Sequence, residues 1–225
     1  MKNTWWNKII ADKPEDERIN HQRGMKEQRG KFKSNNLAMV SQLGRVDLTL
    51  GAVDEESPEP PKLPSIGPMS TDTLDPFMKI IKSWLNAYPP ASRLAFGAIL
   101  GKITTGTQTG HEEILSYLPD IKLDPQNISD LFYQINRPKM STVHPSIRIN
   151  RVSKWSVPLV GTVGVTIDPA VSKATTNMQE WHICKLELDT NTPLLSDVMA
   201  GDGAYQIFRE LADHGQSIAE NGDIP

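Results

Sequence analysis

Side chains that can perform covalent or metal chemistry are few in this sequence and stand apart from one another. The single cysteine, Cys184, lies in a segment of alternating residues that is typical of a strand, so we interpret its thiol as packed and inert. His111 precedes Glu112 and Glu113, residue types that ligate metal ions, but one histidine beside two acids is typical of solvated surface. The other histidines are scattered singly. The sequence therefore predicts no metal site.

Sequence motifs with a known chemical mechanism are also missing. The chain contains no phosphate-binding glycine loop, no nucleophile elbow and no paired cysteines. The two glycines within residues 161–164 fall in a predicted strand, where glycine is typical of a bulge or a close backbone contact. We predict no catalytic residue, no cofactor and no enzymatic activity. An enzyme whose site residues meet only in space stays open as an alternative.

The composition is that of an ordinary folded protein. Its 225 residues are 38% hydrophobic, which suffices for at least one buried core, and 23% are charged. Near-average glycine and proline contents exclude collagen-like and highly charged disordered classes, and one cysteine excludes a disulfide-stapled class. No apolar run of about 18 residues occurs, and the polar start does not resemble a secretory signal. We therefore expect no transmembrane segment, no secretion and a reducing interior.

Charge is distributed unevenly along the chain. Residues 1–35 hold nine basic and five acidic side chains, a net charge of +4. The remainder of the chain has a net charge of −7, so the whole chain has a net charge of −3. We interpret residues 1–35 as a flexible, basic, amphipathic arm with its indoles at a lipid headgroup boundary and its lysines facing anionic lipid. The alternative is that the aromatic pair packs back on the protein. The predicted membrane-contact residues are Lys2, Trp5, Trp6, Lys8, Ile9 and Ile10.

A second group of basic residues follows in the same arm. Glycine here allows close approach to a phosphate, and Phe32 is able to stack on a base. We therefore expect contact with a nucleocapsid, RNA or another anionic surface. The predicted contact residues are Arg23, Lys26, Arg29, Lys31 and Lys33.

Residues 36–69 are expected to hold one short element and a proline-rich acidic linker. Five prolines and four acidic residues fall between residues 51 and 68, a composition that favours extended, solvated backbone. Such a linker is either a plain spacer or a preformed ligand for peptide-binding domains of host proteins. The second role would fall to Pro58, Pro60, Pro61 and Pro64.

The compact part of the chain is predicted to span residues 70–215. Polar capping residues before Pro76 and an apolar stripe from Phe77 to Leu85 predict an amphipathic helix. Further helices are expected at residues 91–102, 112–118, 128–135, 194–199 and 205–212, and strands at residues 146–152, 157–167 and 180–188. We therefore predict an α+β fold with helices on a small antiparallel sheet, followed by a polar tail at residues 216–225 that frays.

The order of these parts resembles that of rhabdovirus matrix proteins, which join a short basic arm and a proline-rich segment to a compact α+β domain. Local similarity covers DPFMKIIKSWLNAYPPASRLAFGAILGKITTG, residues 75–106, and extends more weakly to residues 155–168 and to the opening MKNTWWNKII. The chain departs from the family in lacking a dense lysine cluster and a tyrosine-bearing P-P-x-Y budding motif.

The resemblance implies a non-enzymatic structural protein of the virion and the host cytoplasm. Such a protein lies on the inner face of a membrane, bridges it to the ribonucleoprotein, self-associates and drives assembly and budding. If the arm is independent, deleting residues 1–35 is expected to abolish binding to anionic liposomes and to leave the domain folded. A cytosolic adaptor, with arm and linker as protein ligands, is the alternative from another class.

Overall fold

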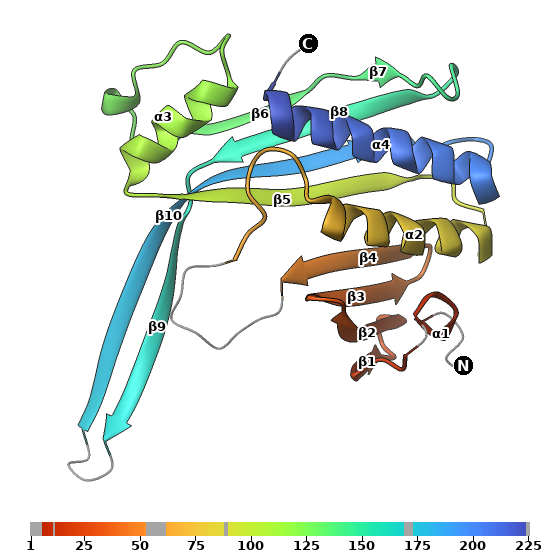
Figure 1. Cartoon of the computed structure of the whole chain (residues 1–225), viewed down its shortest axis with the longest axis horizontal. Coiled ribbons are helices and arrows are strands. Elements are labelled where there is room, and N and C mark those ends of the chain that lie inside the picture. The colour runs from red at the N-terminus through yellow and green to blue at the C-terminus, as the bar shows by residue number, and fades with distance from the viewer. Residues whose placement is uncertain (1–5, 11, 53–61, 88–89, 169–172, 224–225) are drawn as a thin grey trace.

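Two antiparallel sheets, joined by a pair of helices, make up the structure. The computed structural model describes residues 6–10, 12–52, 62–87, 90–168 and 173–223. One sheet, called the small sheet below, has four strands, and the other, the large sheet, has six. Helices α2 (Thr71–Ala87) and α4 (Gly201–Asn221) contact each other, α4 lies over the larger sheet, and the smaller sheet lies beyond α2 (Figure 1).

The four-stranded sheet is a meander in the order β1 (Asp16–Asn20), β2 (Met25–Phe32), β3 (Asn35–Gln42) and β4 (Arg45–Ala52). Apolar residues alternate along β3 and β4, and Leu37 and Met39 of β3 are buried. Gly24 and Gly44 have positive φ in the turns before β2 and before β4, a conformation that favours glycine. Alternation and these two turns are the sequence signals for this sheet.

The prediction of a flexible arm over residues 1–35 is wrong where the structure describes it. Residues 16–32 contain two strands, and helix α1 (Trp6–Ile9) places Trp6, 1% exposed, against Gly30 of β2. A Cβ at residue 30 would lie 3.0 Å from Cζ2 of this indole. Folding removes Trp6, Ile10 and the apolar face of β3 from water, a gain in free energy that the charge pattern does not reveal.

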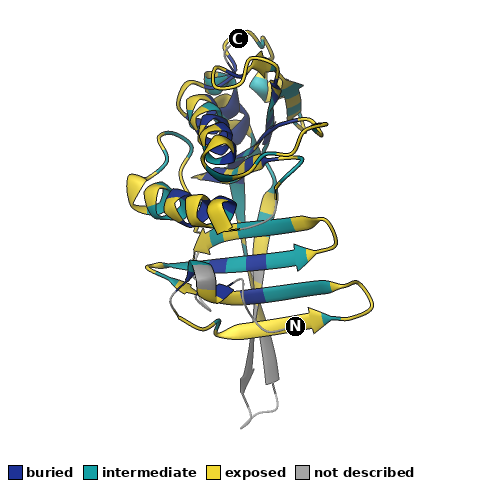
Figure 2. Ribbon diagram, turned by 90° about the vertical axis from the view of Figure 1, so that its right-hand side faces the viewer, coloured by how far each residue is buried: buried dark blue, intermediate teal, exposed yellow. Residues whose placement is uncertain are grey.

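Helix α2 is shared by two cores. Met78, Ile81 and Leu85 pack with residues of α4, whereas Ile80 packs with Trp6 and the small sheet. The apolar stripe that the sequence predicts is therefore divided between two layers. Figure 2 shows buried residues both along the helices and in the middle of the small sheet. Through α2, the N-terminal sheet is attached to the rest of the protein.

The six-stranded sheet has the order β5 (Ala95–Thr104), β10 (Lys173–Asn191), β8 (Arg148–Ser156) and β6 (Phe132–Asn136). The short β7 (Lys139–Met140) pairs with β8, and β9 (Leu159–Asp168) pairs with β10. Trp155 and Leu186 of this sheet pack with Ile114 of α3 (Thr107–Tyr117) and Ile218 of α4. Both helices therefore cover the same face of the sheet.

Strand β10 has 19 residues, and its two halves have different surroundings. Its C-terminal half lies between β5 and β8, whereas its N-terminal half pairs with β9. β8 and β9 keep one register against β10, and at their junction the carbonyl of Pro158 accepts a hydrogen bond from the N–H of Ile183 over 3.1 Å. The outer part projects from the body as a two-stranded hairpin (Figure 1).

Several predicted helices are not helices in the structure. Residues 95–104 form β5, and residues 194–199 hold no helix. In place of the helix expected at residues 128–135, the structure has β6, which follows the 3₁₀ turn η1 (Pro125–Asn127). An apolar run such as residues 94–100 fits a helix or a strand, and pairing with β10 decides between them. The predicted helices at residues 77–85, 112–118 and 205–212 are confirmed within α2, α3 and α4, and the three predicted strands correspond to β8, β9 and β10.

The predicted fraying tail belongs to the core for most of its length. α4 continues to Asn221, with Ile218 and Ala219 buried. The carboxylate of Asp223 accepts hydrogen bonds from Nε of Arg137 over 2.7 Å and from the hydroxyl of Tyr133 over 2.8 Å. These bonds attach the end of α4 to β6 and the residue that follows it.

The α+β class is confirmed, but where the sequence predicts one sheet of few strands, the structure has two sheets, of four and six strands. None of the described helices combines the length and the apolar character required to cross a lipid bilayer.

The buried position of Trp6 predicts a large effect on stability. We expect Trp6→Ala to reduce the free energy of unfolding by about 3–5 kcal/mol, because it leaves a cavity between α1 and the small sheet. Urea denaturation measures this loss. Asn7→Ala, at an exposed position of the same helix, should stay within about 0.5 kcal/mol of the wild type. Equal unfolding of W6A and N7A would contradict the packing described.

Candidate interaction site

The predicted membrane-contact residues are largely inside the protein where the structure describes them. Trp6 and Ile10 are buried, and Ile9 packs against the same core. The Nε1–H of Trp6 donates a hydrogen bond to the carbonyl of Asp12 over 2.9 Å, so the ring and its polar atom both have partners within the chain. The expectation that Trp6 and Ile10 face lipid is therefore wrong for this conformation. Lys8 lies within α1, and Lys2 and Trp5 lie outside the described residues.

The predicted nucleocapsid-contact residues lie on β2 and in the turns at its two ends. Arg29 and Lys31 alternate onto the outer face of the small sheet, whereas Lys26 lies on the opposite face. Arg23 is in the turn before β2, and Lys33 is in the turn after it. The strand thus separates these five cations onto two faces and two ends and does not gather them into one patch.

Acidic side chains neutralise part of this charge. Lys26 lies 3.2 Å from a carboxylate oxygen of Glu17, and Arg29 lies 2.6 Å from one of Glu27. Across the two strands, Asp16 also stands opposite Arg29. Pairs this close to the surface add little stability. Arg29, Glu27 and Asp16 give the outer face charges of both signs, whereas the Lys26–Glu17 pair lies on the opposite face. The exposed cations of the set that remain are Arg23, Lys31 and Lys33.

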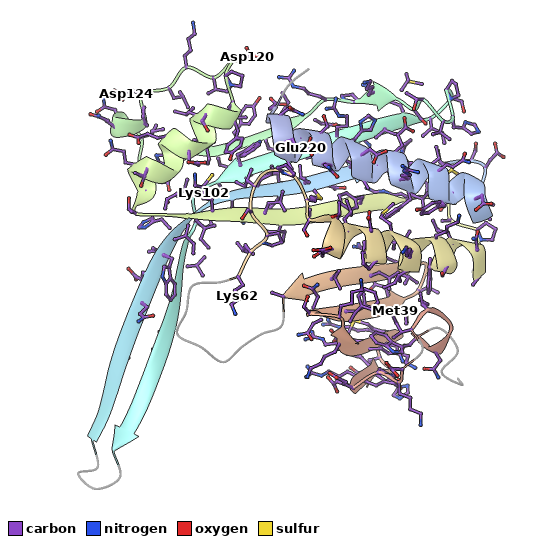
Figure 3. The ribbon with its side chains drawn as sticks, in the orientation of Figure 1. Met39, Lys62, Lys102, Asp120, Asp124 and Glu220 are labelled. Atoms are coloured by element: carbon purple, nitrogen blue, oxygen red, sulfur yellow. The ribbon has the colours of Figure 1, made fainter. Side chains whose placement is uncertain are left out.

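The end of the proline-rich linker is part of the folded structure. The carbonyl of Pro64 accepts a hydrogen bond from the N–H of Gly101 over 2.8 Å, and Leu63 packs over the same glycine. Ile66 and Met69 then pack against the cores. Beyond Lys62 the linker therefore covers the outer edge of β5 (Figure 3). Pro58, Pro60 and Pro61 lie outside the described residues.

Cys184 lies opposite Lys102 of β5, on a strand enclosed by the core. Cys184 is fully buried on β10, and this burial raises the pKa of its thiol to about 12. Since the thiolate is the reactive form, the packed, inert character expected of this residue fits the structure. Within the described ranges, no three His, Cys, Asp or Glu side chains gather where they would hold a metal ion.

Glu210 is a buried acid whose role is to hold a loop. Its carboxylate accepts hydrogen bonds from the hydroxyl of Ser141 over 2.5 Å, and from the N–H and hydroxyl of Thr142 over 2.6 and 2.7 Å. Burial alone would raise the pKa of Glu210, but the bonds from Ser141 and Thr142 outweigh it and hold the pKa below its ordinary value. The connection between β7 and β8 is thereby anchored to α4.

The projecting hairpin carries exposed apolar side chains. Val163 of β9 and Met178 of β10 stand opposite each other, and each is 61% exposed. Leu159, which alternates onto the same face, is 53% exposed at the base of the hairpin. The sequence predicts the strands by alternation but does not show that their apolar face lies beyond the covering helices. This surface is the feature that sequence reasoning missed.

The base of the hairpin packs closely against α3. Gly110 of α3 lies so near the β8–β9 junction that a Cβ at this residue would be 2.5 Å from Cγ1 of Val157. Lys102 of β5, labelled in Figure 3, forms an ion pair of 2.8 Å with Glu113 of α3. These contacts connect α3 to β5 and to the β8–β9 junction, where the hairpin begins.

Comparisons with protein-family models, with curated proteins and with solved structures found no match. The geometry defines an α+β protein with a projecting hairpin that has exposed apolar side chains, and with exposed cations on the four-stranded sheet.

The burial of Cys184 predicts slow thiol chemistry. We expect a thiol reagent to modify it at least about 100-fold more slowly in the folded protein than in urea, since the thiol is enclosed and protonated. Absorbance of the released chromophore measures the rate. In Met178→Cys, the added thiol lies at an exposed position and should react rapidly without urea. Equal rates for Cys184 in folded and unfolded protein would contradict this placement.

The environment of Glu210 predicts a pH-dependent contribution to stability. Its folded pKa is lowered, so its contribution is present above the unfolded value of about 4.3 and is lost as the pH falls through the folded pKa. Glu210→Gln should therefore cost about 1–3 kcal/mol at pH 7 and less at pH 3, as measured by urea unfolding. Glu220→Gln, exposed on the same helix, is the control. A cost that does not change with pH would argue against an ionised Glu210.

Proposed function

We propose that this chain is a non-enzymatic, self-associating structural protein of viral matrix type. In this role it bridges a ribonucleoprotein and the anionic inner leaflet of a membrane, in the host cytoplasm and in the virion, and drives assembly and budding. The proposal combines the local resemblance of residues 75–106 with the exposed surfaces of the fold. The order of the parts supports it less, because the expected arm is part of a sheet.

The observation that carries the proposal is the projecting hairpin. A two-stranded ribbon alone is at best marginally stable in water, but these strands continue two neighbouring strands of the large sheet. The result is an extension of the large sheet that presents Leu159, Val163 and Met178 to the surroundings. An apolar surface held away from the body supports a function in contact with other macromolecules.

Binding to an anionic surface falls, in this proposal, to the exposed cations along β2 and its turns, Arg23, Lys31 and Lys33. Each such side chain contributes about 1 kcal/mol near an anionic membrane, and salt weakens the contribution. One molecule would therefore bind weakly and reversibly. An assembly of many copies would bind firmly, because each further contact is made within the same assembly.

Point substitutions test this role more cleanly than the deletion of residues 1–35. That deletion removes β1, β2 and Trp6, and it uncovers Leu37 and Met39, so it would unfold the small sheet. We expect the triple variant Arg23→Gln, Lys31→Gln, Lys33→Gln to bind phosphatidylserine vesicles about 100-fold more weakly than the wild type, because three contacts with the anionic surface are lost. Cosedimentation across a series of salt concentrations measures this.

A second triple variant controls for net charge. Lys122→Gln, Lys139→Gln, Arg148→Gln removes the same charge from exposed positions outside the small sheet and should bind nearly as the wild type does. Equal losses in both variants would assign the binding to overall charge. Wild-type protein that binds no vesicles, but binds a protein partner independently of salt, would contradict the matrix role and favour the adaptor.

A further inference from the structure

β9 has an unpaired outer edge. Among the described strands, β10 alone pairs with it, along all ten of its residues. The hydrogen bond between Ile183 and Pro158 sets the direction of the backbone groups, because such groups alternate along an antiparallel strand. Residues 160, 162, 164 and 166 therefore direct their N–H groups toward β10. Residues 159, 161, 163, 165 and 167 direct theirs toward the open edge.

Nothing in the sequence of β9 guards this edge. Natural edge strands are protected by charged side chains, prolines, bulges or a covering segment, since an open edge pairs readily with another strand. β9 carries no charged residue before Asp168, and its pairing with β10 runs without a bulge. It is also as long as β5, the other ten-residue strand at a sheet edge.

Three of the other described edges are short, charged or contacted by another segment. β1 consists of Asp16, Glu17 and Arg18 followed by two further residues. The outer edge of β5 is covered by the segment that contains Pro64. β6 has five residues and is followed closely by Pro138. β4 and residues 173–181 of β10 are also described edges, and each carries two charged side chains, Arg45 and Asp47 in β4 and Lys173 and Glu180 in β10. Among the described edges, β9 alone combines ten residues with no charge before Asp168.

We infer that β9 is a self-association edge, which pairs antiparallel with β9 of a second copy of this chain. A two-fold pairing of this kind is self-complementary, because the same edge serves in both molecules. The uncharged sequence of residues 159–167 brings no like charges together, which suits a partner identical to itself. The pairing is centred near Val163 and joins two hairpins into one four-stranded ribbon. It thereby extends the exposed apolar face that holds Val163 and Met178.

This inference names the surface for the self-association in the proposed function, and its test requires no lipid. Amide hydrogen exchange of the wild-type chain, followed by NMR at several protein concentrations, reads the edge directly. The amides of residues 159, 161, 163, 165 and 167 should exchange at least about tenfold more slowly at high concentration, in step with dimer formation by sedimentation. Amides of residues 160 and 162, bonded within the hairpin, are the internal control and should not depend on concentration.

A pair of substitutions at Val163 separates edge pairing from burial of the apolar face. Val163→Pro removes an N–H that points outward, so it should spare the pairing with β10 and raise the dimer dissociation constant at least about tenfold. Val163→Thr loses apolar surface but keeps the N–H, and its dimer should stay within about threefold of the wild type. Circular dichroism of both variants checks that the fold is retained.

Other results would overturn the inference. A wild-type chain that remains monomeric, a dimer whose outward amides stay unprotected, or equal loss of dimer in V163P and V163T would each exclude pairing through β9. Protection that appears only with vesicles would assign this edge to a membrane. If vesicles are not bound but the dimer forms through β9, the membrane role fails and the self-association edge stands.

Discussion

The continuous register between β10 and the β8–β9 pair is the constraint on which the rest of this structure depends. β10 has a neighbour on each side in its C-terminal half and one neighbour, β9, in its N-terminal half. The same ladder of hydrogen bonds therefore builds the centre of the large sheet and the projecting hairpin. Pro158 lacks an N–H but does not end the ladder, because its carbonyl still accepts from Ile183. The hairpin is consequently continuous with the core sheet, and it begins where α3 and α4 stop covering that sheet.

Helix α2 connects the large sheet and its helices to the N-terminal sheet. Its two apolar sides belong to different cores, with Ile80 against the small sheet and Ile81 against the cluster that includes α4 residues. A segment that reads as a charged arm is thereby held in place by burial, and its cations are distributed by strand geometry. Glu210 and Asp223 do the same for the C-terminal half, because each binds a neighbouring segment through several hydrogen bonds. Both ends of the described chain are thus integrated into the body, and the part that projects is an internal hairpin.

This arrangement favours a function in assembly. The thiol of Cys184 is enclosed, the acid Glu210 is used to hold a loop, and the exposed features are an apolar ribbon and cations on a small sheet. In the proposed function, edge pairing between copies would strengthen weak contacts with an anionic surface, because pairing raises the number of contacts that one assembly makes. The proposed membrane contact uses cations on β2 and its turns, whereas the proposed dimer uses the edge of β9. Substitutions can therefore change one without changing the other.

The sequence by itself determined the α+β class, the helix around Phe77–Leu85, the strands of the second half and the packed state of Cys184, because periodicity and composition are local properties. It also contained the turns at Gly24 and Gly44 and the alternation of Val46, Leu48 and Leu50, which indicate the small sheet. Only the tertiary structure decided that residues 95–104 pair as a strand, that Trp6 is buried and that α2 serves two cores. It also decided that the hairpin projects. An apolar face looks the same in the sequence whether a helix covers it or not, and only the positions of α3 and α4 leave Val163 and Met178 exposed.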